Sequence, residues 1–361
     1  MAIQDHNLNL TEQQYRDLEL PSYSMLASID KQGVDVVGGV KTSLNLKFGS
    51  LVDMMCFEPH RVDDNFYQGT SVANPTTNVK KICDIILSGP PKGTPQRIVG
   101  QSVLKRKSGN KSSNLADYET EILAAAKIAG VYKSYTGDKI EHTVIKGGSA
   151  YFKDRITSKG KVLIKPEMWR HAAHTAATLI SHPFTAKYFA QNVPGIEIIY
   201  QYKFDTIVNG HRCKGMLDCL VVNHNAKLIF PIDLKTGELP CKDFPMLYTS
   251  HRYYIQGALY REALETIVGE DFELYDYVVK PFEFVYISKL NPNKPMRFIV
   301  SDDMHKESLK GFKDRFGYSY NGVYSLLDDY YECVSSGFSQ YTNEENLSRG
   351  SVIMDSKLII G

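Results

Sequence analysis

Residues 195–237 alternate apolar and polar side chains, and this period of two restricts the fold more than any other feature of the chain. The dipeptide Asn209-Gly210 divides the first two segments, and Asn-Gly between strand-like segments is the strongest short-range signal of a β-hairpin. A second turn at residues 223–226 separates the third segment, where Pro231 is unusual because proline normally lies at strand edges, strand starts or bulges. The pattern predicts a three-stranded antiparallel meander.

Patterns with helical spacing lie on both sides of the meander, and one more strand-like run follows it. Together they favour the α+β class in a chain of 361 residues, which is long enough for one large domain or two ordinary ones. We expect helices near residues 20–29, 43–57, 114–130, 165–183, 247–269 and 302–335, and a strand at 282–290.

Charge is nearly balanced, with 42 basic and 41 acidic side chains, so a nucleic-acid partner would need a local basic surface. Residues 85–116 offer one, because they have six basic residues and no acidic residue. The same segment is rich in Gly, Pro and Ser, which is typical of a loop. We interpret this segment as an exposed, mobile loop that either contacts phosphates or is a solvated linker. Its basic residues are Lys92, Arg97, Lys105, Arg106, Lys107 and Lys111.

Several classes of protein are disfavoured. No apolar run approaches the roughly 20 residues of a membrane-spanning helix, and the start, MAIQDHNLNLTEQQY, does not have the pattern of a secretory signal. The six scattered cysteines form no C-x-x-C pair, which argues against a zinc ribbon or redox motif and favours reduced thiols in a cytoplasmic protein. A phosphate-binding loop motif is also missing, so we expect no ATP-driven motor.

Asp218 and Asp233 occur in mostly apolar segments, where an unpaired charge is costly to bury, and Lys235 follows two residues later. Adjacent antiparallel strands are about 4.8 Å apart, so the two carboxylates can share a cation such as Mg²⁺, which also takes waters and substrate phosphates as ligands. Lys235 points to the same face as Asp233, whereas Leu234 offers only its carbonyl. The alternative is a buried Asp–Lys ion pair without metal.

Three motifs occur in a fixed order around these residues: G-x-x-D at residues 215–218, D-x-K-T at 233–236, and Q-x-x-x-Y at 256–260. In this order they resemble the PD-(D/E)XK nuclease superfamily, and within it the RecB/RecE-like phage exonuclease branch. Gln256 and Tyr260 are four residues apart on a predicted helix, so both can face one site.

A looser match lies near the N-terminus, in the segments SYSMLASI and FGSLVDMMCFEPH. Asp53 stands where the family has a metal-binding histidine, and a carboxylate is a harder ligand for Mg²⁺. Gln201 aligns with a position where many relatives have glutamate, which would weaken a second metal site there. The resemblance covers residues 20–68 loosely and 195–262 specifically.

The resemblance implies a restriction-endonuclease-like α/β/α core, with a central mixed β-sheet flanked by helices and an N-terminal helical region. It would form a single nuclease domain over residues 1–361. Its parts would be a helical region at 1–84 that supplies a metal ligand, the basic loop at 85–116, a catalytic core at 166–300 and a C-terminal helix and tail at 301–361.

The resemblance also assigns roles to individual residues. Mg²⁺, or Mn²⁺ in its place, would be held by Asp53, Asp218, Asp233 and the carbonyl of Leu234. Lys235 would orient the attacking water or stabilise charge, while Gln256 and Tyr260 would support the site or contact DNA. Apart from the resemblance, the basic residues Lys105, Arg106, Lys107 and Lys214 are expected to bind DNA phosphates. Only Cys333 follows Tyr260, so an iron–sulfur cluster is not expected.

The implied activity is a metal-dependent exonuclease acting on linear double-stranded DNA in phage-type recombination. Its expected location is the cytoplasm, or the host cytoplasm for a viral protein, with a single-strand annealing protein and other copies of the chain as partners. Three alternatives remain: an endonuclease on the same core, a catalytically inactive DNA-binding protein with this fold, and an unrelated α/β protein with a chance D-x-K.

Overall fold

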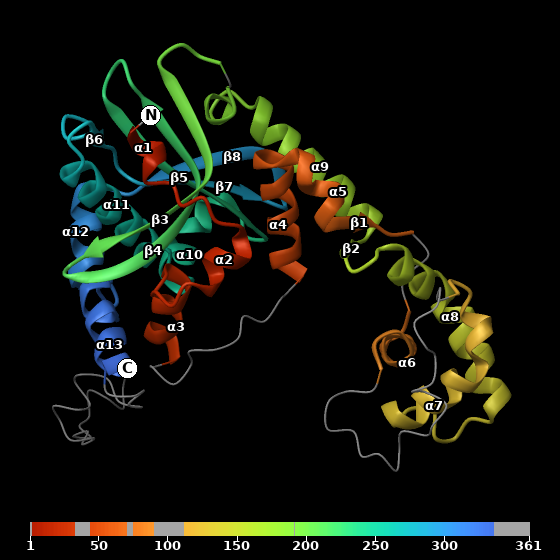
Figure 1. Ribbon diagram of the computed structural model, residues 1–361. Helices are drawn as coiled ribbons and strands as arrows, with labels where there is room; N and C mark the ends of the chain where they lie inside the picture. The colour runs from red at the N-terminus through yellow and green to blue at the C-terminus, as the bar shows by residue number, and fades with distance from the viewer. Residues whose placement is uncertain (1, 33–43, 71–74, 90–111, 191, 336–361) are drawn as a thin grey trace. The chain divides into compact units, whose positions relative to one another are not determined.

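The computed structural model describes residues 2–32, 44–70, 75–89, 112–190 and 192–335 (Figure 1). The chain divides into two compact units, which are described separately. The first unit comprises Met1–Gly49 and Thr175–Gly361, and the second comprises Ser50–His174. Within the described ranges, none of the helices is long and apolar enough to cross a membrane.

The first unit is built on a six-stranded sheet with the order β3-β4-β5-β7-β8, in which β6 also pairs with β5. The predicted meander is confirmed, because β3, β4 and β5 pair antiparallel in sequence order. β5 and β7 are parallel, so the sheet is mixed. The strands are β3 Ile196–Val208, β4 His211–Asn223, β5 Leu228–Gly237, β6 Val278–Val279, β7 Glu283–Ser288 and β8 Asn291–Ile299.

Pro231 lies inside β5, in register with Leu220 of β4. On the other side of β5, pairing with β6 ends at Ile229 and pairing with β7 begins at Ile232. The proline therefore stands where the ladder on that side is interrupted, and its missing N–H is tolerated at such a break.

Helices flank this sheet, as the predicted fold class requires. α11 packs on β3, and α12, α13 and α3 pack around α11 (Figure 1). The core between these layers is aromatic, with Tyr202, Phe204, Tyr254, Phe282 and Phe284 fully buried. The helices of this unit, including two that continue into the second, are α1 Ala2–Asp5, α2 Glu12–Asp17, α3 Tyr23–Gln32, α4 Leu44–Phe57, α9 Pro166–Ser181, α10 Phe244–Ser250, α11 Tyr253–Glu270, α12 Asp302–Lys310 and α13 Val323–Ser335.

Two of the predicted helices are interrupted. The helix expected at 247–269 is wrong as one element, because α10 ends at Ser250 and Arg252 adopts a left-handed φ of 63° before α11 begins. An ion pair with Asp30 holds Arg252 in this conformation. The helix expected at 302–335 is likewise wrong, because Gly311, at φ 98°, ends α12 and a hairpin of β9 Gly311–Lys313 and β10 Ser319–Asn321 precedes α13.

The second unit is mainly helical, with a short parallel pair of strands. Its own core contains Ile82, Leu115, Ile122 and Phe152, and α7 ends at Gly130 in the left-handed conformation, as the sequence predicts. Its elements are α5 Val62–Asn65, α6 Thr77–Ser88, α7 Glu119–Ala129, α8 Gly137–Thr157, β1 Phe66–Gln68 and β2 Val162–Ile164.

Candidate active site

Asp218 and Asp233 lie where β4 and β5 separate. Regular pairing of the two strands ends at Cys219 and Ile232, the neighbours of these acids. Beyond that point the backbone N–H of Leu234 donates instead to Asp218 Oδ2, at 2.9 Å. Two carboxylates from adjacent strands are thereby held at one fork in the sheet.

Gln201 of β3 completes this side of the site. It lies opposite Asp218 in the β3–β4 register, and its side chain hydrogen bonds to that carboxylate. Its φ of 51° is rare for a residue other than glycine. Strained backbone of this kind persists only where surrounding structure enforces it, and such positions cluster at functional sites. Gln201 therefore lies at the candidate site, and its alignment with the family's glutamate stays a prediction.

Asp233 is held by two partners. Gln256 Nε2 on α11 donates to Asp233 Oδ1 at 2.6 Å, and the ammonium of Lys235 forms an ion pair with Oδ2. Asp233 is 2% exposed and Gln256 is 4% exposed. Both the D-x-K triplet and the Q-x-x-x-Y helix therefore contribute to one buried polar cluster in the first unit.

The charges in this cluster perturb one another. Burial, and then the charge of Asp233, raises the pKa of Asp218 to about 7. Burial opposes the charge of Lys235, but the carboxylates of Asp233 and Asp218 outweigh it and hold the pKa of Lys235 above its ordinary value. Two carboxylates against one lysine leave an excess negative charge, so the donor set fits a hard divalent cation.

Two tyrosines beside Lys235 were not predicted as site residues. The ring of Tyr253 lies 5.0 Å from Lys235 Nζ, and the Tyr23 hydroxyl donates to the carbonyl of His251 at 2.9 Å. Burial raises the pKa of both tyrosines, and the nearby charge of Lys235 partly offsets that effect. The available signals were the SYSMLASI segment, which contains Tyr23, and the position of Tyr253 one helical turn before Gln256.

Tyr260 supports β4 from behind. Its side chain is 5% exposed, its ring packs edge-on against Phe204 at 5.6 Å, and it hydrogen bonds to the backbone of Met216. Phe204 in turn fills the space above Gly215, where it leaves no room for a Cβ atom. Its supporting role stays a prediction, and the enclosed side chain offers little surface for the direct DNA contact that was the alternative.

Lys214 requires a correction. We predicted that it binds DNA phosphates, but it is 5% exposed and its ammonium donates to the carbonyls of Tyr15, Arg16 and Leu18. With its hydrogen-bonding capacity used inside the protein, it does not present a charge to solvent. The sequence did not reveal that Lys214 is buried, because its partners are backbone carbonyls of a segment about 200 residues earlier in the chain.

The remaining predicted residues are not tested by this geometry. Asp53 is half-buried on α4, in the second unit, and shares a face of that helix with Gly49, four residues earlier. Lys105, Arg106 and Lys107, and the other basic residues of the 85–116 loop, lie outside the described residues. The C-terminal tail from residue 336 also lies outside them.

No protein-family model matches the chain, and no curated protein matches it. Among solved structures, the crystal structure of a "Putative exonuclease" from Eubacterium rectale aligns over 88% of this chain and 96% of its own, with 15% sequence identity and a TM-score of 0.34. A TM-score this low establishes neither a shared fold nor a shared function.

Proposed function

We propose that this chain is a metal-dependent deoxyribonuclease that hydrolyses phosphodiester bonds and acts as an exonuclease on linear double-stranded DNA. The proposal rests on one observation: Asp218 and Asp233 meet at a fork between strands, with Lys235 and Gln256 bonded to the second acid. A protein that only needed a stable sheet would gain nothing from a half-buried acid placed beside a buried one.

In the first unit, the residues that would hold the cation are Asp218, Asp233 and the Leu234 carbonyl. Asp53 is a proposed further ligand on the N-terminal motif alone. When bound, Mg²⁺, or Mn²⁺ in its place, acidifies a water and neutralises charge on the phosphate. No iron–sulfur cluster or ATP is part of the proposal.

The chain's own groups prepare the site for such a reaction. Gln256 fixes the orientation of Asp233 through its 2.6 Å hydrogen bond. Lys235 stays protonated beside Asp233, and in the proposal its ammonium stabilises negative charge that develops on a phosphate or orients the attacking water. Tyr253 restricts where its ammonium can point. Because these groups are packed before substrate arrives, little reorganisation is needed during reaction.

The finer assignment rests on the motifs. We propose membership in the RecB/RecE-like branch of PD-(D/E)XK nucleases and a role in phage-type DNA recombination in a host cytoplasm. Other copies of the chain and a single-strand annealing protein are the proposed partners. The basic loop containing Lys105, Arg106 and Lys107 is the proposed DNA-binding segment.

The test uses end-labelled linear duplex beside a covalently closed circle, with Mg²⁺ or with EDTA. We expect loss of the linear DNA alone, only with metal, and none with Lys235→Ala. Lys227→Ala is the matched control, because this exposed lysine lies in the turn before β5, where it forms an ion pair with Asp276, and the variant should keep full activity. Cleavage of the circle would favour an endonuclease, and binding without cleavage would favour an inactive DNA-binding protein.

A further inference from the structure

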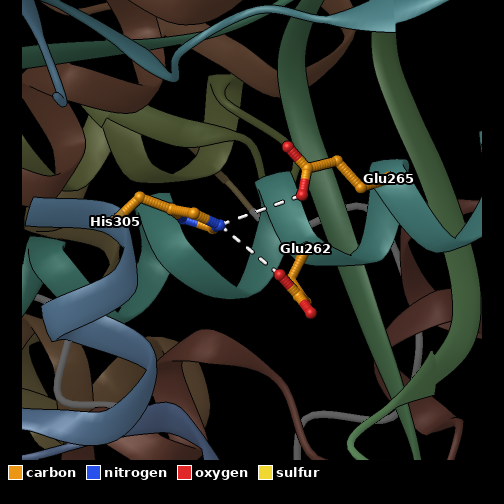
Figure 2. A group of neighbouring side chains, drawn as sticks. All are labelled: Glu262, Glu265 and His305. Atoms are coloured by element: carbon orange, nitrogen blue, oxygen red, sulfur yellow. Dashed lines mark ion pairs between the residues drawn. The ribbon is translucent and has the colours of Figure 1, made fainter. Parts of the chain in front are cut away.

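A second group of metal-binding side chains lies on another face of α11. Figure 2 shows Glu262 and Glu265, from α11, facing His305 of α12. One donor atom from each residue lies within 4.8 Å of the other two. Gln256, which faces Asp233, lies on a different side of the helix, so the two clusters share α11 but no residue.

The imidazole of His305 forms ion pairs with both carboxylates, drawn as dashed lines in Figure 2, at longer distances than the other histidine–carboxylate pairs described below. His305 Nε2 is 3.4 Å from Glu262 Oε2 and 4.0 Å from Glu265 Oε2, although the ring is 5% exposed and points at both. Three other histidines in the described residues pair with carboxylates at hydrogen-bonding distances. They are His6 with Asp271 at 2.7 Å, His211 with Asp328 at 2.7 Å and His224 with Glu197 at 3.0 Å.

Outer partners orient both carboxylates toward His305. Tyr324 donates to Glu262 Oε1 at 3.0 Å, and Arg261 donates to Glu265 Oε1 at 2.8 Å. In each case the first oxygen is occupied and the second oxygen faces the imidazole. Supporting bonds of this kind fix the ligands of metal sites in proteins.

The spacing and charge suit a small divalent cation. Ligands at 2.0–2.2 Å from a tetrahedral Zn²⁺ are about 3.4 Å from one another, which is the distance between His305 and Glu262. The distance from His305 Nε2 to Glu265 Oε2 is longer, at 4.0 Å, and a small rotation of the Glu265 side chain, which is 39% exposed, can shorten it. Asp302, also bound to Arg261, adds a third carboxylate, so negative charge exceeds the one guanidinium.

His305 Nδ1 is buried and has no hydrogen-bond partner in the described part of the protein. A cation on Nε2 leaves a proton on Nδ1, and so does a protonated imidazolium. The free-energy cost of burying an unpaired Nδ1–H is therefore the same with a bound cation as with a protonated imidazolium. It does not favour the ion pair over the metal.

We propose that Glu262, Glu265 and His305 form a divalent-cation site that prefers Zn²⁺ to Mg²⁺, has water as a fourth ligand and links α11 to α12. An imidazole ligand favours Zn²⁺, whereas Mg²⁺ prefers oxygen ligands alone. This proposal does not depend on the proposed nuclease activity, because none of the three residues belongs to the candidate active site.

The test is a calorimetric titration of the full chain, stripped with EDTA, with ZnCl₂ in excess Mg²⁺. We expect one Zn²⁺ per chain, with affinity at least about tenfold weaker in His305→Asn and in Glu265→Gln. His211→Asn is the matched control, because it removes another histidine paired with an acid and should leave the affinity unchanged. The absorption spectrum of bound Co²⁺ should have the bands of a site with nitrogen and oxygen ligands. These bands should disappear in His305→Asn and in Glu265→Gln.

Two results would overturn the proposal. One is the absence of Zn²⁺ binding in excess Mg²⁺. The other is binding that Asp233→Asn abolishes while Glu265→Gln leaves it unchanged, which would place the ion at the candidate active site. Glu265 is half-exposed, so its variant can be measured even if His305→Asn fails to fold.

Discussion

Replacing Gly215 by alanine should destabilise the protein, because the new methyl group would collide with Phe204. An ideal Cβ at Gly215 lies 2.7 and 2.9 Å from the two Cε atoms of that ring and closer still to Cζ. Phe204 is fully buried, and Tyr202 and Tyr260 pack on it with ring centroids at 5.9 and 5.6 Å. The ring therefore cannot move aside without displacing its neighbours.

Overpacking of a well-packed core typically costs 1–3 kcal/mol. Here three ring atoms of an enclosed side chain are involved, so we expect a loss of about 3 kcal/mol in the free energy of unfolding. The measurement is urea unfolding followed by circular dichroism, with an unchanged m-value. Gly269→Ala is the matched control, because nothing lies within 4 Å of its Cβ in α11, and it should gain up to about 1 kcal/mol.

A second substitution tests the cause. In a Phe204→Leu background the colliding ring atoms are gone, so Gly215→Ala should cost at least about 1 kcal/mol less than in the wild type. The proposed nuclease activity should fall in the single variant as well, because Asp218 lies three residues further along β4. A free energy of unfolding within about 0.5 kcal/mol of the wild type, or full additivity in the double variant, would refute this reasoning.

Three further predictions concern the candidate site. Gln256→Leu should lower DNA cleavage at least about tenfold without loss of helical signal, since Asp233 loses the bond that orients it; unchanged turnover at saturating Mg²⁺ would contradict this. Burial and Asp233 raise the pKa of Asp218 to about 7, so the metal-free protein should lose stability as pH rises from 4 to 7. Asp218→Asn should remove that loss, as measured by urea unfolding in EDTA at pH 5 and pH 8; parallel curves for the two proteins would argue against it. Lys214→Met should cost about 2–4 kcal/mol of stability, because three carbonyls lose a charged donor. The salt dependence of DNA binding should stay unchanged in this variant, and a shallower slope would restore Lys214 as a phosphate contact.

The central sheet was predictable because its signals are local. Period-two alternation and the Asn209-Gly210 turn act over neighbouring residues, and β3 and β4 follow them in register. Strand β8 was missed because Asn291–Ile299 contains two prolines and several polar residues without clear alternation. The break before α11 was missed for another reason: Arg252 is held in its left-handed conformation by Asp30, far away in the sequence.

The candidate site likewise combines features that local sequence patterns predict with features that depend on contacts between distant segments. Spacing alone placed Asp233 and Lys235 on one face, and the helix period brought Gln256 to them. The three-dimensional partners of Lys214 and the meeting of His305 with α11 depend on how distant segments pack, and no short motif encodes either. Sequence patterns report what a residue can do locally, whereas burial and partners are set by the tertiary fold.

The buried Lys214 connects β4 to a segment that is synthesised much earlier, so this part of the fold is completed late. Tyr15 and Lys214 are 199 residues apart, and the Leu8 N–H likewise donates to the carbonyl of Lys203. Because residues 8–21 are synthesised before β3 and β4, they must wait for those strands before these bonds can form. Contacts of such long range slow folding and leave the early chain exposed to aggregation. Until these bonds form, β4 carries an unsatisfied ammonium four residues from Asp218, so the strand that supplies one acid of the candidate site is completed only by a segment about 200 residues earlier in the chain.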